Sequence, residues 1–390
     1  MKILYISSID VSNTTGPAAN EREFIPGLYK LIGDKSHFVI PKVRNSFPED
    51  IPITSCSFTK YATTKSLYFW FLHQISIIFT VRKVLYKKKF DFIVMRAGVF
   101  PLAYIYVTRR YKIPYAMKTA GSGEFNVFKG KNIILKMFYG LNIFLYKSLV
   151  KRATSVDVVS PFQKKILSEV TGQGHKIIWI DNGVNENRFH PLDVKKTREN
   201  LDLERFNPII GYVGNLPWER GALQIIEALP KLKEKYPNIM GLILGSGEKM
   251  GVLYSKAEEL GVIDRCVFTG QVPFEEVVKY INVIDIGISQ LFEKSQGASE
   301  QKVRQYLACG KPIIVSPGSV NSFVEEQQLG YIVDPYDKEA FLDAVDKILS
   351  LSEKEYDFIS KKARNYAISN LSYESKIKER LSLYENLLKK

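Results

Sequence analysis

The apolar residues of this chain fall into two alternating patterns. Short apolar runs, KILYI, HFVI and FDFIVM in the first half and PIIGYV, GLIL and VIDIGI in the second, have the length of strands buried in a parallel sheet. Between them lie longer segments in which apolar residues recur every three or four positions, as on one face of a helix. The alternation is typical of consecutive βα units, so we expect an α/β protein built on doubly wound parallel sheets.

The segment 295–317, SQGASEQKVRQYLACGKPIIVSP, predicts a loop, a short helix, a turn and a strand. Val303, Tyr306 and Leu307 would form the apolar face of the helix, and the run IIV has the length of a buried strand. Lys302 would stand in the first turn, where a cation opposes the helix dipole and favours a neighbouring anion. The alternative is that Lys302 simply points into water.

Length and local composition predict two domains. A chain of 390 residues is long enough for two cores. Asn182-Gly183 is a turn signal, and the polar stretch that follows it suits a hinge. We therefore predict a first domain over residues 1–185 and a second over residues 186–370. The terminal segment 371–390 has helical apolar periodicity, and we expect it to return to the first domain.

Charge distinguishes the two halves. Residues 1–190 hold 28 Lys and Arg against 12 Asp and Glu, whereas the remainder holds 27 against 29. Segments 66–90 and 129–152 mix aromatic residues with Lys and Arg and carry almost no acid, which is typical of helices that lie on an anionic bilayer. Alternatively, their apolar faces are core and their lysines are only solvated. No nucleic-acid-binding module has its signature here, so we expect no nucleic acid partner.

The chain shows little sign of export or of a metal. The N-terminal apolar run is short and predicts a strand rather than a signal peptide, and segment 66–81 is interrupted by His73 and Gln74 and is too short to span a bilayer. The three cysteines are scattered and have no metal-ligand spacing with the histidines. We expect a cytosolic protein without a structural metal.

Glycines and cations follow several of the predicted strands. Loops at the carboxyl ends of parallel strands meet at one edge of a sheet, where ligands bind. In the second half, the residues expected to gather at that edge are Gly214, Arg220, Gly245, Gly247, Gly270 and Lys302. In the first half, Gly16 precedes a predicted helix and the segment from Lys118 to Glu124 follows a strand. Ordinary tight turns would explain the same glycines.

Taken as a set and in this order, GYVGNLPWERG, LILGSGE, FTGQVPFEEV and QKVRQYLACGKPIIV resemble the C-terminal half of the family-four (group 1) glycosyltransferases. DNGVNENRFHP resembles their interdomain segment, and SYESKIKERLSLYENLL resembles their C-terminal helix. The resemblance covers about residues 150–390, and it implies the GT-B fold, in which two Rossmann-like domains face each other across a cleft.

The resemblance implies retaining transfer of a sugar from a nucleotide-sugar donor, with no cofactor and no obligatory metal. The second domain would hold the donor and the first the acceptor. Arg220 matches the family's basic residue on the donor diphosphate, Gly16 would close on the same phosphates, and Lys302 lies in the helix that carries the family's acidic residues. Cations at helix N-termini would stabilise the negative charge that develops on a departing diphosphate.

Two positions depart from the family's acidic pattern. The family carries two Glu separated by seven residues, and Gly297 and Gln305 stand at those positions. Gln305 can hydrogen-bond a ribose diol, although less strongly than a carboxylate. Ser299 and Glu300 are the candidates to replace the missing carboxylate.

Two further departures concern the phosphate and catalytic groups. Asn215 stands where the family has an Arg partner to the diphosphate, and Ala120 stands where a His is common. Either this is a divergent branch in which Lys118 and Glu124 take those roles, or activity is lost.

These observations predict a glycosyltransferase that is peripheral on the cytoplasmic face of the membrane. Its acceptor would be a lipid-linked glycan or glycolipid used in surface polysaccharide assembly, and its partners would be the nucleotide-sugar donor, this acceptor and an anionic membrane surface. The alternatives are a non-catalytic partner with the same fold and a nucleotide-sugar epimerase. Activity on a panel of nucleotide sugars distinguishes the three.

Overall fold

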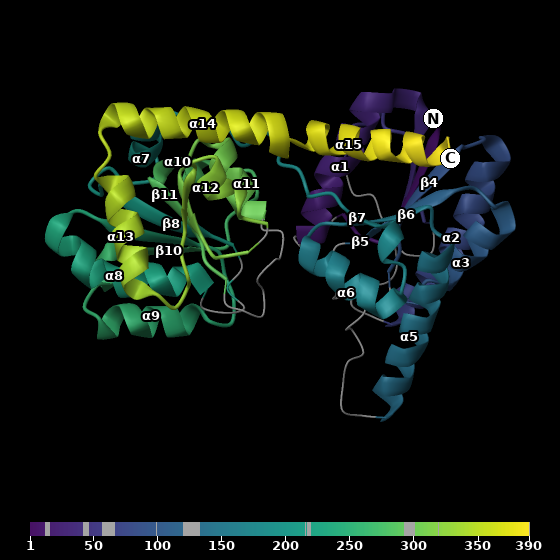
Figure 1. Ribbon diagram of the computed structural model, residues 1–390, viewed down its shortest axis with the longest axis horizontal. Helices are drawn as coiled ribbons and strands as arrows, with labels where there is room; N and C mark the ends of the chain where they lie inside the picture. Colours follow the sequence, from purple (N-terminus) through teal and green to yellow (C-terminus); the bar gives the residue numbers. More distant parts are fainter. Residues whose placement is uncertain are drawn as a thin grey trace. The chain divides into compact units, whose positions relative to one another are not determined.

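The computed structural model divides the chain into two compact units, residues 1–182 with 373–390, and residues 183–372 (Figure 1). The terminal segment thus belongs to the first unit. The structure describes residues 1–11, 16–41, 47–56, 67–98, 100–119, 133–214, 216, 220–291, 301–318 and 320–389.

The first unit is built on a seven-stranded parallel sheet in the order β3-β2-β1-β4-β5-β6-β7. Its main elements are β1 (Ile3–Ser7), α1 (Gly16–Ile32), β2 (Ser36–Ile40), β3 (Ile53–Ser55), α2 (Leu67–Lys87), β4 (Phe92–Arg96), α3 (Leu102–Tyr111), β5 (Tyr115–Thr119), α5 (Ile133–Arg152), β6 (Ser155–Val158), α6 (Pro161–Thr171), β7 (Ile177–Trp179) and α15 (Tyr373–Leu388).

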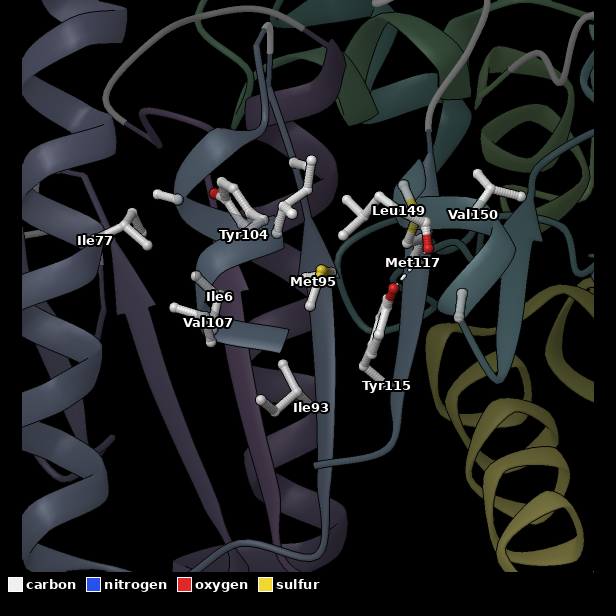
Figure 2. Close-up of a cluster of buried hydrophobic side chains, with 14 of the residues drawn as sticks. Ile6, Ile77, Ile93, Met95, Tyr104, Val107, Tyr115, Met117, Leu149 and Val150 are labelled. Atoms are coloured by element: carbon white, nitrogen blue, oxygen red, sulfur yellow. Dashed lines mark hydrogen bonds between the residues drawn. The ribbon is translucent and has the colours of Figure 1, made fainter. Parts of the chain in front are cut away.

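Alternating strand residues of this sheet supply two separate cores. Leu4 and Ile6 point to the face covered by α2, α3 and α5, while Ile3 and Tyr5 point to the face covered by α1 and α15. Figure 2 shows the first of these cores, in which the Tyr115 hydroxyl donates to the backbone oxygen of Leu149 at 2.5 Å. Both faces are therefore buried, as in other parallel sheets.

The second unit contains a six-stranded parallel sheet in the order β10-β9-β8-β11-β12-β13. Its main elements are α7 (Val194–Glu199), β8 (Ile209–Val213), α8 (Arg220–Lys235), β9 (Met240–Leu244), α9 (Met250–Glu259), β10 (Cys266–Gly270), α10 (Val277–Val283), β11 (Ile286–Ser289), α11 (Gln301–Ala308), β12 (Ile313–Val315), α12 (Phe323–Glu326), β13 (Gly330–Ile332), α13 (Lys338–Leu349) and α14 (Glu353–Leu371).

This unit also has helices on both faces of its sheet. Helices α10, α11 and α14 share one core with alternate strand residues, and α8, α9 and α13 share the other. The prediction of doubly wound parallel sheets is confirmed, and so is the short helix followed by a strand in segment 295–317.

Two searches of the described residues bear on membranes and metals. No helix there combines the length and the apolar composition that crossing a bilayer requires. The same residues contain no cluster of three or more His, Cys, Asp or Glu side chains arranged to hold a metal ion.

Candidate active site

The second unit has a topological switch point between β8 and β11. These strands are neighbours at the centre of the sheet, and the strand order runs outward from them in opposite directions. Helix α8 follows β8 and α11 follows β11, so both helices begin on the carboxyl side of the sheet. This is where open α/β sheets leave a crevice for a ligand.

Tyr306 fixes α11 at this switch point. Its hydroxyl accepts a hydrogen bond from the backbone N–H of Val213, the last residue of β8, at 2.8 Å. The ring fits because Gly287 on β11 has no side chain, and a Cβ there would overlap the ring atoms of Tyr306. The start of α11 is therefore held beside the end of β8.

Lys302, in the first turn of α11, lies over this same edge. Its ammonium nitrogen is 3.9 Å from the ring centroid of Tyr212, a cation–π distance. A Cβ added to Gly214 would come within 3.3 Å of the Lys302 Cε and Nζ atoms, so the glycine leaves room for the lysine. Of the two interpretations drawn from the sequence, this geometry favours a cation directed along the sheet edge.

The predicted glycines of the second unit come together in adjacent loops. The N–H of Gly214 donates to the oxygen of Leu244 at 2.9 Å, and the N–H of Gly245 donates to the oxygen of Gly270 at 2.9 Å. A side chain on Gly245 would overlap the backbone oxygen of Gly214, and its φ of +135° also favours glycine. A side chain on Gly247 would likewise overlap the Leu216 backbone.

Helix α8 brings a second N-terminus to the same place. Arg220 is its first residue, although the Arg220 side chain lies outside the described part of the structure. Gly221 packs so closely on β11 that a Cβ would lie 2.9 Å from Ile288 Cγ2 and 3.2 Å from the backbone nitrogen of Gln290. The starts of α8 and α11 therefore both lie at the switch point, an arrangement suited to a diphosphate.

The remaining donor-site predictions fare differently. Gln305 lies on α11 and is buried. Four others, Asn215, Gly297, Ser299 and Glu300, lie outside the described residues. Their predicted contacts with the donor stay predictions.

In the first unit, the predicted residues do not form an open site among the described residues. Gly16 is the first residue of α1, and Glu124 lies outside the described residues. Lys118 is only 4% exposed; its amino group donates to Asn20 Oδ1 at 3.4 Å and lies 3.5 Å from the Phe24 ring centroid. Lys118 thus points into the core under α1.

Lys118 belongs to a buried row of charged side chains. Strand register places Arg96, Lys118 and Asp157 side by side on β4, β5 and β6. Glu21 of α1 accepts from Arg96 Nη1 at 2.7 Å and from the Tyr5 hydroxyl at 2.6 Å, and all of these side chains are buried. The pair ties the beginning of α1 to the centre of the sheet.

Burial and charge shift the pKa values in this row. Burial lowers the pKa of Lys118 to about 7, and the Glu21 carboxylate offsets only part of that effect. Burial alone would raise the pKa of Glu21, but Lys118 and Arg96 outweigh it and hold that pKa below its ordinary value. Burial also raises the pKa of Asp157. Lys118 is therefore a buried amine whose pKa lies near neutrality.

Helix α15 closes the row from the C-terminal end of the chain. The Tyr384 hydroxyl donates to Asp157, and Arg380 Nε lies 3.8 Å from the same carboxylate. Arg380 also donates to the backbone oxygen of Ile180 at 2.8 Å. The terminal helix is thus joined to the sheet by polar contacts as well as by its apolar face.

Sequence reasoning missed the residues that position this site. Tyr212, Glu21 and Arg96 were not singled out, and Tyr306 was assigned only to the apolar face of its helix, because each acts through a partner far away in the sequence. One signal was available in the sequence, because Arg96 ends the apolar run FIVM. A charge at the end of a buried strand is costly to bury without a partner of opposite charge.

Comparison with known proteins bears on both units. Residues 193–366 match the model of the glycosyl transferases group 1 family. A GDP-mannose-dependent alpha-(1-6)-phosphatidylinositol monomannoside mannosyltransferase of Mycolicibacterium smegmatis is 24% identical over 57% of this chain and 60% of that protein. The chain spans about half to three-fifths of the length of the first curated relatives it matches.

Two solved structures match nearly the whole chain. A glycosyltransferase from Rickettsia africae has a TM-score of 0.76 and 20% identity, with 100% of this chain and 99% of that chain covered. Anabaena HepE in complex with UDP has a TM-score of 0.71 and 16% identity, with 98% and 100% covered. At such identities the likeness shows the fold, and the fold of this chain is GT-B.

Proposed function

Because residues 193–366 belong to the group 1 glycosyl transferases, we propose that this chain transfers a sugar from a nucleotide-sugar donor, bound by the second unit, to an acceptor bound by the first. The observation that carries the proposal is the switch point, where the starts of α8 and α11 meet beside Lys302 and close-packed glycine loops. The mannosyltransferase relative is named for a GDP-mannose donor, and HepE was solved with UDP. Both names fit a nucleoside diphosphate at this edge.

The chemistry follows from the charges there. An acceptor hydroxyl forms a new bond to the anomeric carbon, the bond from that carbon to the diphosphate oxygen breaks, and the proton of the hydroxyl passes to solvent water. Negative charge then develops on the departing diphosphate. Arg220 and Lys302, with the N–H groups at the starts of their helices, stabilise that charge without a proton relay. By resemblance to the family, the anomeric configuration is retained.

Each of the other predicted residues has a distinct role in this proposal. Gln305 holds the ribose, and Gly16 lets the start of α1 approach the phosphates. Lys118 acts by positioning: with Glu21 and Arg96 it holds the first turns of α1, and its burial speaks against contact with substrate. Glu124 remains the candidate for a direct catalytic contact from the first unit.

The acceptor is proposed to be lipid-linked, and the protein to work peripherally on the inner face of the membrane. The basic excess of residues 1–190 supports this, since it lies in the acceptor half of the chain. The mannosyltransferase relative is named for an acceptor that contains phosphatidylinositol. The sugar, the nucleotide base and the linkage are left to experiment.

A panel of UDP-, GDP- and ADP-sugars tests the proposal. Slow release of nucleoside diphosphate and free sugar from at least one of them, without added acceptor, is the expected result. Interconversion of one nucleotide sugar into another would instead identify an epimerase. If no member of the panel raises the melting temperature, that result supports a non-catalytic partner, because a ligand at a hundred times its Kd stabilises a protein by about 2.7 kcal/mol.

A further inference from the structure

Three helices of the first unit lie against one face of its sheet. Helices α2, α3 and α5 share one hydrophobic core with the strands, and α3 contacts both of the others (Figures 1 and 2). Because one side of each helix faces this core, their opposite sides are directed to solvent.

The solvent sides of these helices carry large apolar side chains. On α2, Phe71, Phe79 and Tyr86 recur at intervals of eight and seven residues and so lie along one stripe. Leu102 and Tyr106 are one turn apart on α3. The exposed apolar side chains of the three helices, between 44% and 92% exposed, are Phe71, Phe79, Tyr86, Leu102, Tyr106, Met137, Phe138, Leu141 and Phe144. They make up half of the eighteen exposed large apolar side chains among the described residues.

The same helices contain no acid. Residues 67–87, 102–111 and 133–152 include nine Lys and Arg and not one Asp or Glu. The cations lie within or beside the apolar stripes: Arg82 falls between Phe79 and Tyr86 on α2, and Arg109 and Arg110 follow Tyr106 on α3. Long basic side chains can extend from such a surface to reach anionic headgroups while the apolar groups insert.

We propose that the solvent side of α2, α3 and α5 is a docking face for an anionic lipid bilayer. Aromatic and aliphatic side chains beside unopposed cations fit an interface with apolar depth and negative headgroups. A second copy of this chain fits poorly, because each face would bring nine cations and no carboxylate to the contact. This proposal extends the proposed function by naming the surface that would bring the protein to a lipid-linked acceptor. Vesicle binding itself does not depend on the proposed function, which only gives the binding its biological purpose.

Vesicle cosedimentation with the full chain tests the docking face without donor or acceptor. The probes are vesicles of phosphatidylcholine and vesicles of phosphatidylcholine with phosphatidylglycerol in equal parts. The wild-type protein is expected to bind the second kind, less so at high salt because exposed charges are screened. A triple variant, Phe71→Ser, Phe79→Ser and Phe144→Ser, is expected to bind them at least about tenfold more weakly.

The matched control is Phe358→Ser. Phe358 lies on α14 of the second unit and is 63% exposed, close to the exposure of Phe71 at 64% and Phe144 at 67%. The Phe358→Ser substitution removes a comparable apolar side chain from another surface and should leave vesicle binding unchanged. Nucleoside diphosphate binding, followed by thermal shift, should be the same in wild type and triple variant, so that failure of the donor site and failure of the docking face are read separately.

Several results would overturn the proposal. These are equal binding of wild type and triple variant, equal binding to both kinds of vesicle, or binding to neither. Analytical sedimentation of the protein without vesicles provides one further test. If wild type is a dimer and the triple variant is a monomer, the face belongs to a second copy of the chain and the proposal is overturned. If the triple variant fails to fold, a second variant that combines Lys87→Gln, Lys88→Gln and Lys89→Gln takes its place in the vesicle assay. Unchanged binding of that variant to the anionic vesicles would contradict the proposal.

Discussion

The two units build their sheets in the same way but differ at the edge where ligands bind. In both, the strand order runs outward from the first strand in two directions. In the second unit the central loops are glycine-rich, and Lys302 lies over them against the ring of Tyr212. In the first unit, charged side chains from β4, β5 and β6 turn inward and are covered by α1 and α15.

The difference indicates a division of labour. Glycine loops let the backbone approach a ligand, so the second unit is suited to hold phosphates. A buried ion pair binds nothing itself, but it fixes a helix relative to a sheet. In the first unit this pair holds the start of α1, where Gly16 lies. The predictions below separate these two uses of one fold.

The largest effect on stability is expected at Glu21. Glu21→Gln removes the buried carboxylate that accepts from Arg96 and lies near Lys118, and breaking a buried pair in this way costs about 3–5 kcal/mol. Urea unfolding measures it. The control is Glu374→Gln in the exposed pair with Lys30, whose side chains are 37% and 69% exposed, where a much smaller loss of stability is expected because water screens the two charges. Equal midpoints for the two variants would mean that the buried row does not stabilise the fold.

The largest effect on activity is expected at the switch point. Arg220→Ala and Lys302→Ala should each slow sugar transfer by about 10²–10³-fold with the fold intact, because each removes charge that stabilises the departing diphosphate. Steady-state kinetics on the donor identified by the panel measures this. Lys231→Ala, an exposed lysine further along α8, serves as the control and should retain wild-type rates. Full activity in both site variants would show that the phosphates bind elsewhere.

A smaller effect, dependent on pH, is expected from Lys118. Below about pH 7 the folded protein buries a protonated amine, whereas between pH 7 and the ordinary pKa of 10.5 the folded amine is neutral and the unfolded one still protonated. The unfolded state then binds more protons, so the free energy of unfolding rises with pH across this window. Relative to Lys118→Met, wild type should gain about 3 kcal/mol from pH 7 to 10, since each pH unit inside this window contributes up to about 1.4 kcal/mol. Parallel stability profiles for the two proteins would rule out a buried, titrating Lys118.

The smallest effect is expected at Gln305. If this side chain binds the ribose diol, Gln305→Glu should keep or improve donor affinity by up to about tenfold, since a carboxylate accepts the two hydroxyls more strongly. Gln305→Leu should weaken binding. Isothermal titration with the nucleoside diphosphate is the measurement, and a weaker Glu variant with an unaffected Leu variant would exclude the ribose contact.

How far the sequence predicts the structure depends on the distance between partners. The strands and α11 follow from local apolar patterns, and the gathering of Gly214, Gly245 and Gly270 follows from their common place after parallel strands. Pairings across long separations leave no local trace: Glu21 and Arg96 are 75 residues apart, and Val213 and Tyr306 are 93 apart. These pairings position the candidate site.

Composition can be read from the sequence, whereas the burial of individual side chains cannot. The basic, aromatic make-up of segments 66–90 and 129–152 is visible in the sequence, but which of their side chains face water is not. Helix α3 completes the exposed face, but its segment is too short to show a distinctive composition in the sequence. Lys118 looked like a residue at an open strand end, and only the packing of α1 over the sheet buries it.

Hydrogen exchange of the full chain with and without its nucleotide-sugar donor tests most directly whether the second unit holds the donor. The account predicts slower exchange in peptides that cover the starts of α8 and α11 and the loops after β8, β9 and β10, with the centre of the first sheet unchanged. Protection confined to the first unit, with none at these loops, would contradict it.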